Sequence, residues 1–571
     1  MSLAACGDED TSSDTDNATA DDDSTTDSDE SGNGDSSKDE SDDEGNSKPI
    51  KLPDGGTKPG KSDAGGSKPG KDGGSNVEQQ DKADAGPCTG ISVGARCVKK
   101  EHVTIIDREP QTSDDGNMLY QFDKSYENIG ALLKNKPKVA PSADLGEWYM
   151  YNGDYVRLGV AYDSFKNSGG SIADKDRLPQ RDGRNKDLTW SLNAVKSTDG
   201  DDIAAPNCLV CHFAYFDDKL IRGLGRNKHW IASDASGFTL NVPVIAVNSI
   251  LSLDAISQLD NGLGLLLHLF PEVGYSHLFD LFAGLAMKHD PNTLEYTGNL
   301  NGGDPNSHMQ GWIEFPNWWT FKKRNSLYWN GSGQGNKANH LWYMNWFSLN
   351  STEEAQEVIN NFGHVEKYLE EKIPTPKFED FGKGKIDKAL AAKGEQVFLQ
   401  SCAFCHGTYS ENDEDETYPN ALVDIAEVGT DPKLATNHWI YPVESWYSKS
   451  WYAKQNLGAH IVKTNGFVAP ALDGVFITAP YLHNGSVPTL EQLLDPSKRL
   501  DVWTTNNNAD DYDWEALGWK DKPLDLDIWT LDQNFGIYNT SEPGNSNKGH
   551  TYGAALSPEE RRQVLEYLKT L

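Results

Sequence analysis

Residues 393–406 read KGEQVFLQSCAFCH and decide the fold of the C-terminal part of the chain. The stretch ends in Cys402, Cys405 and His406, which form a C-x-x-C-H motif. Two thiols three positions apart can bond to the two vinyl groups of one porphyrin, and the histidine that follows then lies under the iron. The stretch therefore predicts a covalently bound c-type haem with His406 as an iron ligand.

The same motif occurs a second time, because Cys208, Cys211 and His212 repeat the C-x-x-C-H spacing. Cys208 precedes Cys402 by 194 residues. A zinc site explains the two motifs poorly, since the sequence offers no further cysteine pair of this kind to complete a four-cysteine site. We therefore expect two covalently bound c-type haems, with His212 as an iron ligand of the first.

Residues 386–571 follow the plan of a cytochrome c domain. The apolar residues of 386–400 recur with a mostly helical period, which predicts a helix that ends just before the motif. A last helix is predicted after Ser557, because Pro558 and Glu560 complete the signals of a helix start and a capping box. The apolar face of this last helix is expected to consist of Val564, Leu565, Leu568 and Leu571.

Composition and motifs divide the chain into three parts. Residues 1–86 are rich in Asp, Ser, Thr and Gly and nearly lack large apolar residues, so we expect a disordered acidic tail. Residues 87–385 are expected to form an N-terminal haem domain with a long aromatic-rich insertion, and residues 386–571 a C-terminal cytochrome c domain. The expected fold class is mainly α, with two cytochrome c-like haem domains and long loops. The rings of the insertion are Trp312, Phe315, Trp318, Trp319, Phe321, Tyr328, Trp329, Trp342, Tyr343, Trp346 and Phe347.

The chain is strongly acidic, with 52 Lys and Arg against 87 Asp and Glu and a formal net charge of −35. Residues 1–50 contain 17 acidic and two basic residues, and residues 51–86 contain six of each. The remaining acidic excess therefore lies in the part that is expected to fold. Such a surface argues against nucleic acid and anionic lipid as binding partners.

The first residues indicate how the tail is attached. Residues 3–6 read LAAC and resemble a bacterial lipobox, although the apolar stretch of a signal peptide does not precede them. Because c-type haem is attached outside the cytoplasm, we expect an exported protein of the periplasm or the cell surface, held at the outer membrane only by a lipid on Cys6. The sequence contains no run of about 18 apolar residues, so it predicts no membrane span. A local disulfide between Cys88 and Cys97 is also expected.

The second axial ligand of each haem separates an electron carrier from a catalyst. No methionine follows Cys402, and the histidines downstream of the second motif are His438, His460, His483 and His550. His550 is the best candidate, because it ends the glycine- and asparagine-rich stretch 544–550 just before the last helix. A bis-histidine haem would store or relay electrons. The first haem has no equally well placed second ligand, so an open iron face there would make it the catalytic haem.

A further segment points to a family. Residues 479–485 read APYLHNG and are followed by Thr489 and Leu490. Together with the two C-x-x-C-H motifs, this segment closely resembles the signature of the bacterial di-haem cytochrome c peroxidase and MauG superfamily, over roughly residues 200–571. The missing methionine, the long separation of the motifs and the late histidine most resemble the di-haem rubber oxygenase branch. Related bacterial di-haem enzymes add dioxygen to unsaturated fatty acids.

The resemblance implies a division of labour between the haems. In that branch the N-terminal haem binds dioxygen and the C-terminal haem is bis-histidine, which here implies His406 and His550 as its ligands. Some relatives hold a calcium ion between the haems. The rubber oxygenases also have aromatic residues near the oxygen-binding haem in a segment similar to the one that contains Trp318 and Trp319.

Two further residues are candidates for a role in the site. His340 would be a general base for the heterolysis of peroxide if it stood over the first haem. Tyr481 could assist electron transfer or donate a hydrogen bond to a haem propionate.

Three functions are compatible with two haems. The leading hypothesis is an exported dioxygenase that uses dioxygen to cleave or oxygenate an unsaturated apolar substrate, either polyisoprene or an unsaturated fatty acid. The alternative is a peroxidase that reduces hydrogen peroxide with electrons from a partner cytochrome. A di-haem electron carrier is the third, and it would need neither the long insertion nor the signature segment.

Overall fold

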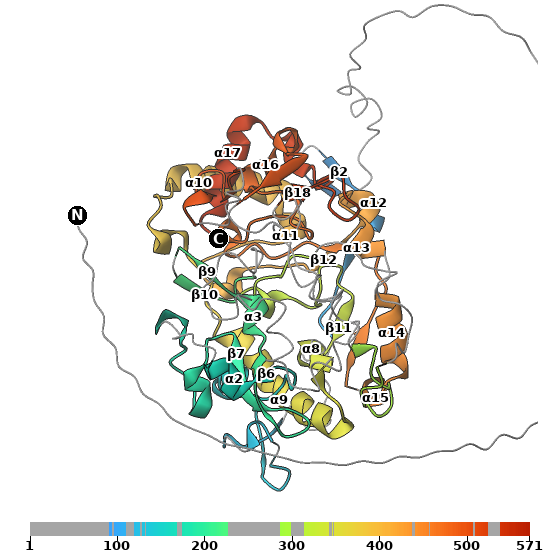
Figure 1. Ribbon diagram of the computed structural model, residues 1–571. Coiled ribbons are helices and arrows are strands. Elements are labelled where there is room, and N and C mark those ends of the chain that lie inside the picture. Colours follow the sequence, from blue (N-terminus) through green and yellow to red (C-terminus); the bar gives the residue numbers. More distant parts are fainter. Residues whose placement is uncertain are drawn as a thin grey trace, which may run out of the picture. The chain divides into compact units, whose positions relative to one another are not determined.

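The structure is a computed structural model (Figure 1), and its described residues all belong to one unit, Lys82–Leu571. The predicted tail with Cys6 and the side chains of the expected Cys88–Cys97 disulfide lie outside the described part. None of the described helices is long and apolar enough to span a bilayer. The described residues are 91–93, 96–109, 119–125, 128–131, 133–167, 174–217, 219–225, 286–298, 313–341, 345–346, 348–436, 440–455, 457–505, 509–522 and 537–571.

The second C-x-x-C-H motif lies, in chain order, between two helices that pack closely against each other. These helices are α10 (Lys388–Ser401) and α17 (Pro558–Leu568), which lie side by side in Figure 1. The side chain of Asp387 caps the start of α10 by accepting hydrogen bonds from backbone N–H groups of its first turn. A Cβ atom on Gly394 would overlap the carbonyl group of Gln563. Glycine is therefore required where the two backbones meet.

The first motif lies, in chain order, between two helices that pack in the same way. They are α1 (Ala143–Asn152) and α9 (Thr352–Glu371), and each begins after a serine whose side chain accepts a hydrogen bond from the first turn. A Cβ atom on Gly146 would overlap the carbonyl group of His364. Each motif is therefore enclosed in sequence by two helices that cross at a glycine.

The likeness of the two pairs extends to a tyrosine. Tyr368 of α9 lies against Gly146, and Tyr567 of α17 lies against Gly394. Each tyrosine lies four residues after the residue whose carbonyl group meets the glycine. Both tyrosines therefore lie on the same helix face as that residue, one turn further along. The two helix pairs therefore share one packing arrangement around the two motifs.

The predicted helices around the second motif are found with small shifts. The helix predicted over 386–400 is observed as α10, which starts two residues later. The capping box between Ser557 and Glu560 is confirmed, with Pro558 in the first turn. The expected apolar face is also confirmed: Val564, Leu565 and Leu568 are buried, and Leu571 packs against the same core.

Short antiparallel sheets, which the sequence did not predict, connect the loops between these helices. The two-stranded ones are β1 (Ile91–Val93) with β2 (Arg96–Val98), β4 (Leu119–Tyr120) with β5 (Lys138–Val139), β9 (Phe213–Phe216) with β10 (Lys219–Arg222), β11 (Gly333–Gly335) with β13 (Ala459–Ile461), β15 (Val502–Thr504) with β18 (Ile537–Asn539), and β16 (Tyr512–Asp513) with β17 (Gly518–Trp519). The three-stranded ones are β6 (Val160–Ala161), β8 (Asp202–Pro206) and β7 (Leu192–Lys196), and β14 (Gly466–Val468), β12 (Ala421–Asp424) and β3 (Val103–Ile105).

The remaining α-helices of the described part have ten residues or fewer. They are α2 (Tyr162–Asn167), α3 (Leu209–His212), α8 (Lys337–Leu341), α11 (Ala403–His406), α12 (Ile425–Val428), α13 (Lys433–Thr436), α14 (Ile440–Lys449), α15 (Trp451–Lys454) and α16 (Leu490–Leu494). Two of them, α3 and α11, carry the ends of the two haem motifs.

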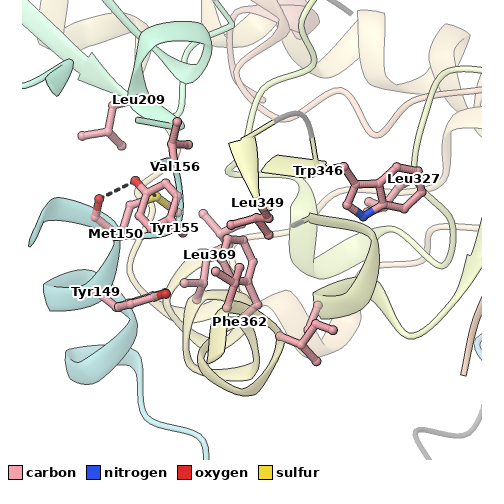
Figure 2. Close-up of a cluster of buried hydrophobic side chains, with 14 of the residues drawn as sticks. Tyr149, Met150, Tyr155, Val156, Leu209, Leu327, Trp346, Leu349, Phe362 and Leu369 are labelled. Carbon is pink, nitrogen blue, oxygen red and sulfur yellow. Dashed lines mark hydrogen bonds between the residues drawn. The ribbon is translucent and has the colours of Figure 1, made fainter. Parts of the chain in front are cut away.

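The buried apolar side chains form two main clusters. The first core surrounds α1 and α9, and Figure 2 shows Tyr149 and Met150 of α1 together with Phe362 and Leu369 of α9. The hydroxyl group of Tyr155 donates to the Met150 carbonyl at 2.6 Å and so joins the end of α1 to the following loop. The second core surrounds α10, α17 and the signature segment. The first motif packs against the first core, whereas the second motif contacts both cores, Cys402 the second and Cys405 the first.

Replacing Gly394 with alanine is expected to destabilise the protein, although alanine favours a helix over glycine by about 1 kcal/mol. The added methyl group would overlap the backbone at Gln563, and overpacking of this kind costs about 1–3 kcal/mol. The denaturant midpoint of the haem-loaded protein measures the effect. Gly384→Ala is a matched control, because a Cβ atom there would meet only the Phe378 ring at 3.8 Å. A higher midpoint for Gly394→Ala would contradict the packing described above.

Candidate haem sites

The first motif is held at the edge of the first core. Cys208 precedes the short helix α3, whose Leu209 and Val210 are buried in that core. Cys208 and Cys211 are partly exposed. The two apolar residues between them therefore anchor the motif in the first core.

His212 is fixed by contacts on two sides. Its Nδ1 atom donates to the Pro316 carbonyl at 3.1 Å, and its ring stacks on Trp318 with centroids 4.4 Å apart. Burial lowers the pKa of His212 to about 3, although the hydrogen bond to Pro316 opposes that change. The imidazole is therefore neutral near pH 7. With Nδ1 as the donor, Nε2 keeps its lone pair for a metal.

The second motif repeats this arrangement. Cys402 directly follows α10, and His406 ends the short helix α11. The Nδ1 atom of His406 donates to the Pro470 carbonyl at 2.8 Å, and burial lowers the pKa of His406. A backbone carbonyl thus orients the histidine of each motif, and Nε2 is again left for a metal.

His550 lies opposite His406. The centroids of the two imidazole rings are 6.1 Å apart, and the ring planes meet at 65°. Two imidazoles on opposite sides of one metal would have centroids about 6 Å apart, with bonds of about 2 Å and centroids about 1 Å beyond the nitrogens. The observed separation therefore fits one iron atom between the rings.

The other histidines downstream of the second motif lie elsewhere. His460 pairs with Glu109 at 3.0 Å, and His483 stacks on Phe467 with centroids 3.9 Å apart. His438 lies outside the described residues. Within the described part, the histidine that faces His406 is thus the one that the sequence favours.

The backbone at His550 is in an uncommon conformation. His550 has a φ of 44°, in the left-handed region, and it follows Gly549 with a φ of 76°. For a residue with a side chain such strain costs about 1 kcal/mol or more, and it persists where the surrounding structure enforces it. The N–H group of His550 donates to the Val428 carbonyl at 2.7 Å. The chain therefore holds this imidazole in place against its own backbone preference.

Trp318 and Trp319 lie in different cores. Trp318 stacks on His212 in the first core, whereas the Nε1 atom of Trp319 donates to the Asp473 carbonyl at 2.7 Å and its ring is buried in the second core. Asp473 is three residues from Pro470, which binds His406. The adjacent tryptophans therefore connect the segments that orient the two haem histidines.

The contacts of His340 tie its ring to β11. Its Nε2 atom lies 2.7 Å from the Gln334 carbonyl, and its ring meets Tyr328 edge-on with centroids 6.1 Å apart. Burial lowers the pKa of His340 to about 4, so the imidazole is neutral near pH 7. These contacts do not join it to His212, and its role as a general base stays a prediction.

Tyr481 is buried in the second core. Its hydroxyl group lies 3.1 Å from the Val475 carbonyl and 3.0 Å from the Leu517 carbonyl. A tyrosine hydroxyl has a single hydrogen to donate. These contacts therefore favour a structural role over the predicted hydrogen bond to a haem propionate.

Several groups at the sites escape prediction from the sequence. The carbonyl acceptors Pro316 and Pro470 carry no signal, because every residue has a carbonyl group. Within the described residues, no cluster of three or more His, Cys, Asp or Glu side chains could hold a metal ion. The rings of the insertion that lie outside the described residues are Trp312, Trp342, Tyr343 and Phe347.

Comparisons with known proteins match parts of this chain. Residues 466–504 match the family model described as RoxA-like, cytochrome c-like. Uncharacterized protein y4iJ of Sinorhizobium fredii (strain NBRC 101917 / NGR234) is 29% identical over 248 residues, covering 33% of this chain and 40% of the relative. Uncharacterized protein y4iM of the same strain is 25% identical over 223 residues, covering 32% and 49%. The chain thus spans less than half the length of either relative. The family match supports a RoxA-like cytochrome c and indicates a haem-dependent oxidoreductase.

Proposed function

We propose that this protein is a di-haem c-type dioxygenase that cleaves or oxygenates an unsaturated apolar substrate, either polyisoprene or an unsaturated fatty acid. The match to the RoxA-like cytochrome c model supports the oxidoreductase class. The different surroundings of His212 and His406 support separate roles for the two haems.

The observation that carries the proposal is the position of His550. His406 faces a second imidazole at a centroid separation of 6.1 Å, which suits a six-coordinate haem. Such a haem has no free position for a substrate and would store or relay electrons. The haem that Cys208, Cys211 and His212 would hold is therefore the proposed site of the reaction.

The haem at His212 would supply the oxygen chemistry when bound. The chain orients it, because the Pro316 carbonyl and the Trp318 ring fix the neutral imidazole of His212 from two sides. Trp318 and Trp319 would couple the two haems, since their contacts reach from His212 to the Asp473 carbonyl near Pro470.

The proposed cleavage needs no external reductant. One carbon–carbon double bond and one dioxygen molecule give two carbonyl groups, so both oxygen atoms end in the products and the electrons balance. A peroxidase, in contrast, must receive two electrons for each hydrogen peroxide molecule that it reduces to water. The two reactions therefore differ in their need for an electron donor.

Oxygen uptake by the purified, air-oxidised protein tests the proposal. We expect uptake with polyisoprene or an unsaturated fatty acid in the absence of reductant, with isotopically labelled oxygen recovered in the products. Peroxide-dependent oxidation of a reduced cytochrome without oxygen uptake would show a peroxidase instead. If neither reaction occurs, the electron carrier remains.

We also propose that the protein is exported, because c-type haem is attached outside the cytoplasm. A lipid on Cys6 would then hold it at the periplasmic or outer face of a membrane. Mass analysis of the protein from its native membrane tests this part separately from the reaction.

A further inference from the structure

The stretch that carries His550 is firmly bonded to the rest of the protein. The fully buried amide of Asn484 donates from its side-chain nitrogen to the Gly544 carbonyl at 2.9 Å and to the Ser546 carbonyl at 3.1 Å. The N–H group of Ser546 donates to the Asp431 carboxylate at 3.2 Å. A stretch rich in glycine and asparagine is thus held on several sides.

Arg499 makes the largest contribution to this anchoring. Its guanidinium donates to the carbonyl groups of Asn547 at 2.5 Å, Gly549 at 2.8 Å and His550 at 3.1 Å. Three of the last four carbonyl groups of the stretch, including that of the candidate ligand itself, therefore accept from one side chain.

The other two donors of Arg499 reach a helix end. They bind the carbonyl groups of Gln492 at 3.2 Å and Leu493 at 3.3 Å, in the last turn of α16. The last carbonyl groups of a helix have no partner within it, so a cation there also meets the negative end of the helix dipole. An arginine has five N–H donors, and all five are used here.

The backbone of His550 explains why such a clamp is needed. Its left-handed φ of 44° is disfavoured for a residue with a side chain, and two of the Arg499 bonds go to the carbonyl groups on either side of this strained position. Without these bonds the stretch could relax and turn the imidazole away from His406.

We propose that Arg499 is the positioning residue that holds His550 against His406 and so keeps the second haem closed to external ligands. Asn484 supports the same stretch from its other end. The inference rests on the proposed role of His550 as an axial ligand. The hydrogen bonds of Arg499 in the described part all go to backbone carbonyl groups, so it acts on His550 through the backbone of residues 547–550.

The test compares Arg499→Gln and Arg499→Lys with the unchanged protein, all carrying both haems. The readouts are the low-spin signal of the second haem and the number of carbon monoxide molecules bound per reduced chain. For Arg499→Gln we expect part of the low-spin signal to be lost and carbon monoxide binding to rise from one toward two per chain. Lysine offers three donors on one nitrogen and cannot span five carbonyl groups. The readouts of Arg499→Lys should therefore lie between those of Arg499→Gln and those of the unchanged protein.

Two further variants separate positioning from general damage. Asn484→Asp keeps the shape of the side chain but turns the donor into an acceptor facing two carbonyl groups, so it should produce the same spectral change. Arg561→Gln is the matched control, because Arg561 binds the carbonyl groups of Gly553 and Ala554, just beyond His550, and contacts none in residues 544–550 among the hydrogen bonds of the described part. It should lower stability without opening the second haem.

The outcomes distinguish this inference from the proposed function. If His550→Ala removes the low-spin signal while Arg499→Gln and Asn484→Asp leave it intact, the positioning role is wrong and the axial role of His550 stands. If Arg561→Gln opens the second haem as much as Arg499→Gln does, the effect is general destabilisation and the inference fails. If His550→Ala itself leaves the signal unchanged, the axial assignment fails first.

Discussion

A chain in which Cys208 and Cys211 are both replaced by serine is expected to lose one haem and all oxygen uptake, while it keeps the spectrum of a bis-histidine haem. The mass should fall by one haem, because serine forms no thioether with a vinyl group. Even changes to groups that only orient a metal ligand cost about 10–100-fold in activity, so loss of the haem should exceed that range. Mass spectrometry, absorption spectra and oxygen uptake check the three expectations.

The reciprocal chain, with serine at Cys402 and Cys405, is the control for this experiment. It should lose the bis-histidine spectrum and keep the haem at His212, whose iron should still bind carbon monoxide. Continued oxygen uptake by the chain that lacks the first haem would contradict the assignment of the reaction to that site.

Replacing His550 with alanine is expected to convert the second haem from a low-spin to a high-spin state. The ring centroids of His406 and His550 are 6.1 Å apart, so the substitution removes the imidazole that faces the metal position while the orienting bond from His406 to Pro470 remains. Electron paramagnetic resonance of the oxidised protein should show the loss of one low-spin signal. Added imidazole should restore it.

His483→Ala is the matched control for His550→Ala. His483 is also a buried histidine downstream of the second motif, but its ring stacks on Phe467 and not on His406. We expect this variant to lose stability and to keep both haem signals. A low-spin signal that survives in His550→Ala and disappears in His483→Ala would reverse the assignment.

The features that the sequence predicts correctly depend on residues that are close in the chain. The start of α17 follows from Ser557, Pro558 and Glu560, and the end of α10 follows from the position of Cys402. The local sequence context favours His550 as a ligand, and the structure places it opposite His406. Local signals of this kind suffice when a cap, a motif or a glycine-rich stretch marks the position.

The features that escaped prediction depend on contacts between distant segments. The Pro316 carbonyl reaches His212 over a separation of 104 residues, and nothing in the residue type marks it. The bonds from Arg499 to residues 547–550 likewise join segments that are about 50 residues apart. An arginine after a short helix is common, and only the folded chain shows that its five donors converge on carbonyl groups.

The shared packing of the two helix pairs was also hidden in the sequence. Gly146 and Gly394 are each one glycine among 53, and the carbonyl groups that they approach lie more than 160 residues away. The small sheets were missed for a related reason, since strands of two to five residues give too short a pattern to identify. Tertiary contacts thus define most of what surrounds the motifs.

Carbon monoxide titration of the unmodified, fully reduced protein tests the assignment of the two haem sites. We infer that the chain binds two haems, that His406 and His550 close the second, and that the haem at His212 has an open face. We therefore expect one carbon monoxide molecule per two haems, and none in the chain with serine at Cys208 and Cys211. Two molecules per chain, or none in the unmodified protein, would contradict it.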